Sequence, residues 1–257
     1  MRRSPRVVVL AVLTALAACG TADPPAGSAE GGVSGEVTVF AAASLTETFT
    51  ELGKRFEKAH PGTTVTVNFG ASSALAKQIT EGAPADVFAS ASPANMAQVT
   101  DAGAAAGDPT TFARNRLVIA VPAGNPGGVT GLDDFADPGR KIALCAEQVP
   151  CGAAARKALD AAGVSAEPDT FEQDVKAALT KVSLGEVDAA LVYTTDVRAA
   201  GDDVEGIEFP EAGQAINDYP IVVCKDAPNA GAATAFVDLV RSARGRAVLS
   251  AAGFEEP

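Results

Sequence analysis

The chain has 257 residues, a formal net charge of −12 and a single histidine. This acidic balance argues against nucleic-acid binding, and no group of side chains stands out as a metal-ligand cluster. The length is enough for one large or two small lobes with cores of their own.

Residues 1–18 have the pattern of a targeting segment. Three arginines within the first six residues precede an apolar run over 7–18, which is too short to span a bilayer as a stable helix. The run ends in Leu-Ala-Ala-Cys at Cys19, which resembles a bacterial lipobox and implies cleavage before Cys19 and lipidation of that cysteine. Lipid there would anchor the protein to a membrane without spanning it. A plain signal peptide with an incidental cysteine is the alternative.

The next segment, 19–35, is rich in glycine, proline and serine and is predicted to be a flexible tether. Removing the residues before Cys19 takes away three arginines and no acidic residue, so the side chains of the mature chain sum to about −15. Such a charge argues against long-range steering of an anionic ligand, although helix N-termini act locally.

The first folded element is predicted to be a buried strand, carrying Val37, Val39 and Phe40, that runs directly into a helix. Ser44 and Glu47 have the spacing of a capping box, with Ser44 as the N-cap. A helix N-terminus at the carboxyl end of a strand offers free N–H groups and a partial positive charge. The junction is therefore a candidate anion site, with an ordinary strand–helix junction as the alternative.

The same pattern recurs 28 residues later. Apolar residues alternate over 65–69, and the chain then turns into a helix for which Ser72 or Ser73 is the expected N-cap. On adjacent parallel strands, the two helix starts at Ser44 and Ser72 would face the same crevice.

Later strand-like and helix-like runs alternate, which predicts an α/β fold with a mainly parallel sheet. The further candidate strands are 117–121, 141–145, 188–193 and 221–224, and the further candidate helices are 93–101, 153–162, 175–184, 232–242 and 245–252.

Three cysteines follow Cys19. Cys145 and Cys151 are six residues apart, which in an exported protein favours a small-loop disulfide. Cys224 lies in an apolar run and is expected to stay buried as a small apolar residue, although a pairing of Cys145 with Cys224 stays open.

The runs 39–45 (Val-Phe-Ala-Ala-Ala-Ser-Leu), 69–75 and 81–91, in this order, resemble the periplasmic molybdate-binding protein family, the substrate-capturing component of an ABC importer. The resemblance extends from Glu36 to the C-terminus, where Gly253-Phe254 matches the family's ending. It implies a type II periplasmic-binding-protein architecture, α/β with two lobes and a ligand cleft between the lobes.

The resemblance also implies where the lobes divide. We place the first lobe at 36–115 plus 217–257 and the second at 116–216, with the chain crossing near 114–121 and 216–221. A single open sheet without a cleft is the alternative.

The site implied by the resemblance has five residues. They are hydroxyl donors and backbone N–H donors, namely Ser44, Ser72, Cys151, Val175 and Tyr193. The family has a small residue, alanine, where this chain has Cys151, and a backbone donor survives that change if the turn is kept. Taken singly, Val175 could be a core residue, Tyr193 a strand-end aromatic and Cys151 only half of a disulfide.

None of these residues is cationic, and hydroxyl and N–H donors suit a fully deprotonated tetrahedral oxyanion. The implied ligand is molybdate or tungstate, with sulfate or another tetrahedral oxyanion as the alternative, and neither a cofactor nor a metal beyond the oxyanion is expected. Ferric iron would call for tyrosine pairs and carboxylates, and the chain has two tyrosines. We expect a monomer at the cell surface, lipid-anchored through Cys19, that delivers the ion to permease subunits and binds no nucleic acid.

Two other classes compete with this interpretation. A serine or cysteine hydrolase would use Ser44 or Cys151 as nucleophile and would need a nearby base. The only histidine, His60, precedes Pro61-Gly62 in a predicted surface turn, so no enzyme is expected. A lipid-anchored interaction module without a small ligand would leave the matched serine helix starts unexplained.

Overall fold

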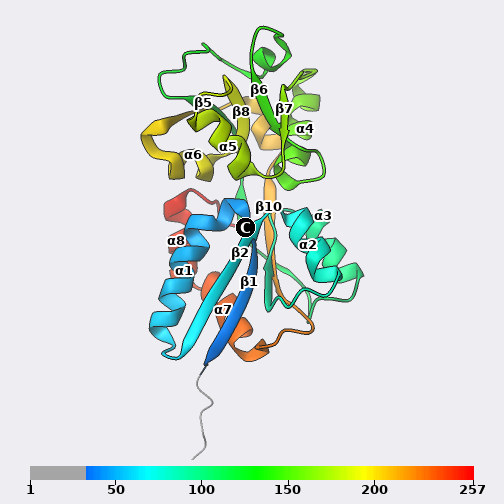
Figure 1. Cartoon of the computed structure of the whole chain (residues 1–257), viewed down its shortest axis with the longest axis vertical. Coiled ribbons are helices and arrows are strands. Elements are labelled where there is room, and N and C mark those ends of the chain that lie inside the picture. The colour runs from blue at the N-terminus through cyan, green and yellow to red at the C-terminus, as the bar shows by residue number, and fades with distance from the viewer. Residues whose placement is uncertain (1–32) are drawn as a thin grey trace, which may run out of the picture. The chain divides into compact units, whose positions relative to one another are not determined.

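The computed structural model describes residues 33–257 (Figure 1). The predicted targeting segment 1–18, the proposed lipidation site Cys19 and most of the predicted tether 19–35 lie outside the described residues. Within 33–257, every helix falls short of the length and apolar character that crossing a membrane requires.

The first sheet has five strands in the order β2-β1-β3-β10-β4. Their bounds are Gly35–Ala42 for β1, Thr63–Gly70 for β2, Val87–Ala89 for β3, Thr110–Asn115 for β4 and Asn217–Val223 for β10. The helices that pack with them are α1 (Thr46–Ala59), α2 (Ser72–Thr80), α3 (Pro93–Asp101), α7 (Ala230–Arg241) and α8 (Ala243–Ala252). We call this assembly the first lobe.

The second sheet also has five strands, in the order β7-β6-β8-β5-β9. Their bounds are Leu117–Pro122 for β5, Ile142–Cys145 for β6, Thr170–Glu172 for β7, Ala189–Tyr193 for β8 and Val204–Ile207 for β9. The helices of this second lobe are α4 (Pro150–Ala162), α5 (Val175–Ser183) and α6 (Thr194–Ala200).

Both sheets are mixed: four strands of each run in one direction, as the prediction of a mainly parallel sheet requires, and one strand runs against them. In the first sheet β10 runs antiparallel to β3 and β4, and in the second β5 runs antiparallel to β8 and β9. The reason lies in the path of the chain: β5 and β10 are the strands by which it enters each lobe from the other. A strand that starts at the edge where the parallel strands end must run against them.

The chain passes between the lobes twice. Arg116 alone separates β4 from β5, and the return runs from β9 through the short 3-10 helix Pro210–Gln214 into β10. The strand β10 therefore begins beside the second lobe and ends deep in the first.

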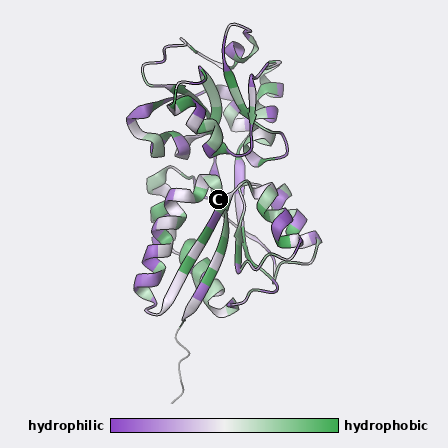
Figure 2. Cartoon of the chain, in the orientation of Figure 1, coloured by the Kyte–Doolittle hydropathy of each residue, from purple (hydrophilic) through white to green (hydrophobic). Residues whose placement is uncertain are grey.

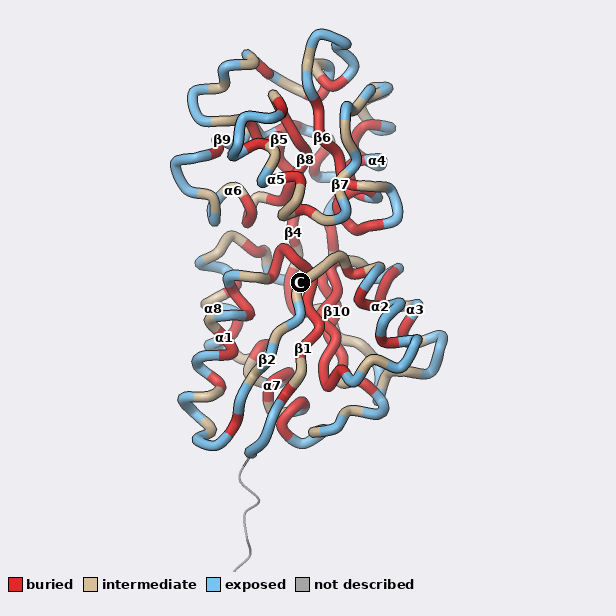
Figure 3. The backbone as a smooth tube through the Cα atoms, viewed as in Figure 1, coloured by how far each residue is buried: buried red, intermediate tan, exposed pale blue. Residues whose placement is uncertain are grey.

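The core follows from the apolar periodicity. On α1, Phe49, Leu52 and Phe56 are spaced three and four residues apart and are fully buried, as one face of an amphipathic helix requires. The central strands of both sheets are apolar and buried, whereas the outer faces of the helices are polar and exposed (Figures 2 and 3). In the second lobe, β5 and β8 are buried along nearly their whole length, which is typical of strands covered on both faces.

Candidate functional site

Four helical segments begin just after the end of a strand and meet at one cavity. They are the 3-10 helix Ala43–Leu45 after β1, α2 after β2, α4 after β6 and α5 after β7. Each lobe contributes two of these starts. The cavity offers about 20 Å³ of open space, slightly more than the roughly 10–15 Å³ that holds one water molecule. It therefore suits a very compact ligand.

The structure brings all five predicted site residues to this cavity. Its lining includes Ser44 and Ser72 from the first lobe and Cys151, Val175 and Tyr193 from the second. Their role in binding stays a prediction, but their convergence from segments up to 149 residues apart in sequence is a property of the fold.

The capping box predicted at Ser44 is wrong. The chain first makes the 3-10 turn Ala43–Leu45, so the N-cap of α1 is Leu45 and no side chain caps that helix. The Ser44 hydroxyl lies 2.9 Å from the Tyr219 hydroxyl instead. The carboxylate of Glu47 contacts Lys176 Nζ at 2.9 Å.

Ser72 is the first residue of α2, and the N-cap is Ala71, so the predicted N-cap is also wrong. The fully buried Ser72 Oγ accepts a hydrogen bond of 2.9 Å from the backbone N–H of Ala91. Because a hydroxyl that accepts one bond still has its hydrogen, Ser72 keeps a donor available at the cavity.

Three of the four helix starts at the cavity lack a side-chain cap, and the fourth, α5, is capped by Asp174. The helix starts at Ala43, Ser72 and Pro150 have no side-chain cap, whereas α3, α7 and α8 are capped by Ser92, Asn229 and Ser242. The first N–H groups of a helix have no partner within it. The uncapped starts therefore leave N–H groups and the positive ends of helix dipoles at the cavity.

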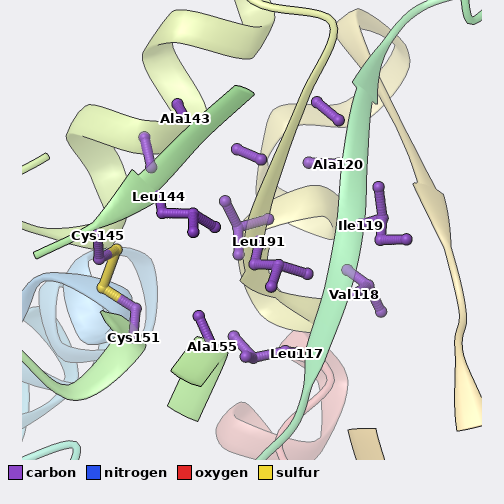
Figure 4. Close-up of a cluster of buried hydrophobic side chains, with 14 of the residues drawn as sticks. Leu117, Val118, Ile119, Ala120, Ala143, Leu144, Cys145, Cys151, Ala155 and Leu191 are labelled. Carbon is purple, nitrogen blue, oxygen red and sulfur yellow. A yellow bond between two sulfur atoms is a disulfide. The ribbon is translucent and has the colours of Figure 1, made fainter. Parts of the chain in front are cut away.

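The start of α4 is joined to the end of β6. A disulfide links Cys145 with Cys151 (Figure 4). Gly152 allows this close approach, because a Cβ at that position would lie 2.0 Å from the carbonyl oxygen of Ala146. Since Pro150 has no N–H, Cys151 carries the first backbone donor of the helix. Cys224 is free and buried, and burial raises the pKa of its thiol to about 12.

Tyr193 ends β8 and is almost fully buried. Its hydroxyl has no hydrogen-bond partner among residues 33–257, although buried polar groups normally have one. Burial is the main cause that raises its pKa well above 10, so the hydroxyl stays protonated and can donate. An unpartnered buried donor on the cavity lining indicates a place for an acceptor.

The lining carries no lysine or arginine, and Asp174 is its one acidic residue. Asp174 is the N-cap of α5, and its Oδ1 accepts a hydrogen bond of 2.9 Å from the N–H of Ala177. The positive potential in the cavity therefore comes from helix starts and hydroxyls.

A charged cluster that the sequence analysis missed lies beside the cavity. Lys176, on α5, contacts Glu47 of α1 at 2.9 Å and Asp196 at 3.2 Å, so it links the two lobes. Burial alone would lower the pKa of Lys176, but the charges of Asp196 and Glu47 outweigh it and the pKa is raised. Burial raises the pKa of Asp196 to about 6, against the opposing effect of Lys176.

Tyr219 and Asn115 were also missed as site residues. Tyr219 stands behind Ser44 on β10, and Asn115 ends β4. No local pattern could have found them, because their partners are distant in sequence. Tyr219 is 175 residues from Ser44, and Asn115 is 80 residues from Thr195.

The two α/β lobes, with one small cavity lined from both, define a two-lobed solute-binding protein of the periplasmic-binding-protein type, as the sequence predicts. The chain belongs to the bacterial extracellular solute-binding protein family, whose sequence profile matches residues 37–255. The family places the protein outside the cytoplasm.

Individual relatives narrow the comparison. The chain is 43% identical over 254 residues to the molybdate-binding protein ModA of Mycobacterium tuberculosis (strain ATCC 25618 / H37Rv), and 97% of each chain is covered. It resembles the structure of the Azotobacter vinelandii periplasmic molybdate-binding protein at 25% identity and a TM-score of 0.76, over 86% of this chain and 99% of that one. It also resembles the sulfate-binding protein SubI from Mycobacterium tuberculosis H37Rv at 20% identity and a TM-score of 0.73, over 86% of each chain, which is a likeness of fold alone.

Proposed function

We propose that the protein captures molybdate, and also tungstate, outside the cytoplasm and delivers it to the permease of an ABC importer. The observation that carries this proposal is the cavity itself. It is small, and residues of both lobes line it, with hydroxyls and three uncapped helix starts and without a basic side chain. The relatives named as molybdate-binding proteins support the choice of ligand.

The donor chemistry favours a fully deprotonated tetrahedral oxyanion. Ser72 keeps its hydrogen because its oxygen already accepts from Ala91, and the Tyr193 hydroxyl is protonated and unpartnered within residues 33–257. The first N–H groups of α4 and α5, at Cys151 and Val175, add two donors. A protonated anion brings a hydrogen that needs an acceptor, and burying it unpaired costs roughly 1–3 kcal/mol.

Sulfate is the competing ligand, because it is also a fully deprotonated tetrahedral dianion and the fold is shared with a sulfate-binding protein. Discrimination between sulfate and molybdate would depend on how the size of the closed cavity matches each ion. Sulfate binding would keep the mechanism and change the substrate.

Closure of the lobes completes the proposed site. An ion pair between Lys176 and Glu47 joins α5 of the second lobe to α1 of the first. Each residue lies in the first turn of its helix. We infer that this contact forms when the lobes close on the ion and breaks on release to the permease.

A hydrolase is not favoured. The sulfur of Cys151 is bonded to Cys145, and the Ser44 hydroxyl faces Tyr219. His60 follows α1, stacks on Phe56 with ring centroids 4.5 Å apart and is not on the cavity lining. These placements leave neither candidate nucleophile with a neighbouring base.

The membrane anchor belongs to the same proposal. Lipid on Cys19 and a tether over 19–35 would hold a monomeric binding protein at the cell surface near its permease. Radiolabelled fatty acid should enter the expressed protein, and a Cys19→Ser variant should lose the label and leave the membrane fraction.

The ligand proposal is tested by thermal melting of the chain without residues 1–19, in molybdate, tungstate, sulfate and phosphate. A ligand at 100 times its dissociation constant stabilises the native state by about 2.7 kcal/mol, which is a visible shift. A shift with molybdate and tungstate alone supports the proposal. A shift with sulfate alone changes the substrate, and a flat response to all four ions contradicts it.

A further inference from the structure

Tyr219 lies directly behind one wall of the cavity. It is fully buried on β10, it is not part of the lining, and its hydroxyl lies 2.9 Å from Ser44 Oγ. Ser44 therefore separates Tyr219 from the ligand space. A side chain in this place acts on a ligand through the serine.

The ring of Tyr219 is held in one position by other aromatic rings. Its centroid lies 6.4 Å from Phe112, 6.1 Å from Tyr193 and 5.3 Å from Phe254, and all three contacts are edge-to-face. Such pairs prefer a defined geometry, so the position of the hydroxyl is fixed by packing. Two of these neighbours belong to the first lobe and Tyr193 to the second.

The direction of the hydrogen bond between Tyr219 and Ser44 follows from what surrounds Tyr219. Burial raises the pKa of Tyr219 further above its usual value, so the phenol keeps its hydrogen. Ser44 Oγ is the one hydrogen-bond partner of this hydroxyl among residues 33–257. Asn115 Oδ1 accepts from the N–H of Arg116 at 3.0 Å, and its Nδ2 donates to Thr195 Oγ1 at 2.9 Å. Both bonds tie the amide of Asn115, at the end of β4, to groups other than Tyr219.

A hydroxyl has one hydrogen, and a buried one needs an acceptor. Because Ser44 Oγ is the acceptor within hydrogen-bond distance of Tyr219 in the described part of the chain, the Tyr219 hydrogen goes to Ser44 Oγ. When Ser44 accepts this bond, its own hydrogen turns toward the cavity.

We propose that Tyr219 is a positioning residue that holds the Ser44 hydroxyl as a donor and so favours fully deprotonated tetrahedral oxyanions over protonated ones. A serine hydroxyl that is free to rotate can accept as well as donate, and it would then tolerate the hydrogen of hydrogenphosphate. The inference rests on the proposed oxyanion function and adds to it the residue that sets its selectivity.

The test is the Tyr219→Phe variant, which removes the hydroxyl and keeps the ring. We expect the dissociation constant of molybdate to rise about tenfold, because the Ser44 hydroxyl loses the bond that holds it in the donor orientation. Hydrogenphosphate, measured by competition with molybdate, should weaken less or bind better, so the selectivity ratio falls about tenfold. The matched control is Thr48→Val, which removes another buried hydroxyl, bonded to the carbonyl of Leu45.

A double-variant cycle separates positioning from packing. In the Ser44→Ala background there is no serine hydroxyl left to orient, so Tyr219→Phe should change the molybdate affinity less than twofold. A repeated tenfold loss in that background, or equal losses for both anions in the single variant, would overturn the inference. If the parent chain binds no oxyanion, the proposed function fails; if it binds molybdate and Tyr219→Phe leaves the selectivity unchanged, the inference alone fails.

Discussion

At the scale of single residues, the proposed site is lined by hydroxyls that keep a hydrogen to donate. Ser72 accepts from Ala91, and Tyr193 is a buried phenol without a partner among residues 33–257. The Ser72 hydroxyl therefore stabilises the ligand-free protein, whereas the Tyr193 hydroxyl costs it free energy, and we propose that both donate to a bound anion. Stability and binding should therefore respond differently when the hydroxyls are removed.

The variant Ser72→Ala should weaken molybdate binding by about tenfold or more, because it removes a donor at the cavity. It should also lower the free energy of unfolding by about 1 kcal/mol, because the buried N–H of Ala91 loses its acceptor. The neighbouring Ser73→Ala is the control, since Ser73 is not on the lining. Titration calorimetry and chemical unfolding measure the two effects. Equal affinities for both variants would contradict the assignment of Ser72.

The variant Tyr193→Phe should separate the two effects most clearly. It removes an unpaired buried hydroxyl, so the ligand-free protein should gain about 1 kcal/mol of stability or stay unchanged. Molybdate affinity should fall by about tenfold or more, because the anion loses a donor. Loss of stability with unchanged affinity would show that the Tyr193 hydroxyl serves the fold and not the ligand.

At the scale of elements, sequence patterns predict what is local. The helical spacing of apolar residues on α1 and their alternation along β2 are patterns within a few residues of sequence. The predicted helix and strand are present at these positions. The predicted cap at Ser44 is wrong because a 3-10 turn comes before α1. The propensities of these residues do not exclude that turn. The antiparallel direction of β5 and β10 could not be predicted, because it depends on how the chain crosses between the lobes.

The five proposed site residues come from the family resemblance, whereas the contacts of Tyr219, Lys176 and Asp196 were not predicted. Tyr219 lies in an apolar strand, and its role at the proposed site depends on its contact with Ser44, which is 175 residues away in sequence. Lys176 looks like an ordinary surface lysine on α5 until α1 is placed against it. The size of the cavity depends on the fit of both lobes, and no single segment carries that information.

The raised pKa of the buried Asp196 carboxylate predicts how the stability of the protein depends on pH. Its pKa is about 6 in the folded protein against 3.8 in the unfolded chain, so the folded state binds more protons between these values. Its contribution to the free energy of unfolding should therefore become more favourable as the pH falls from 7 to 5, by about 1 kcal/mol. The difference between the parent chain and Asp196→Asn measures it.

The control for the Asp196 prediction is Asp134→Asn. The backbone hydrogen bond from Thr130 is the main cause that holds the pKa of Asp134 below 3.8, so its contribution changes only below that pH. A difference between the parent chain and Asp196→Asn that stays constant from pH 7 to 5 would show that Asp196 is not the titrating group.

At the scale of the whole molecule, we propose that the two lobes close on an ion held by both. The contact of Lys176 with Glu47 crosses between the lobes, so it should slow release without adding much stability. An exposed ion pair contributes about 0–1 kcal/mol, which corresponds to no more than about a fivefold change in rate.

The variant Glu47→Gln should therefore raise the dissociation rate of molybdate a few-fold, up to about fivefold, and leave the melting temperature of the ligand-free protein within error. Glu51→Gln is the matched control, because Glu51 pairs with Arg55 inside the same helix and is exposed. Stopped-flow measurement with a competing anion gives the rates. A similar change in both variants would indicate a general charge effect and no role in closure.

The central claim is that a small cavity of hydroxyls and helix starts, closed by both lobes, selects a fully deprotonated tetrahedral oxyanion. Titration calorimetry of the chain without residues 1–19, with molybdate and hydrogenphosphate near neutral pH, tests it most directly. The account predicts one molybdate per chain and an affinity for hydrogenphosphate at least about tenfold weaker. Equal affinities, or heat with neither anion, would contradict it.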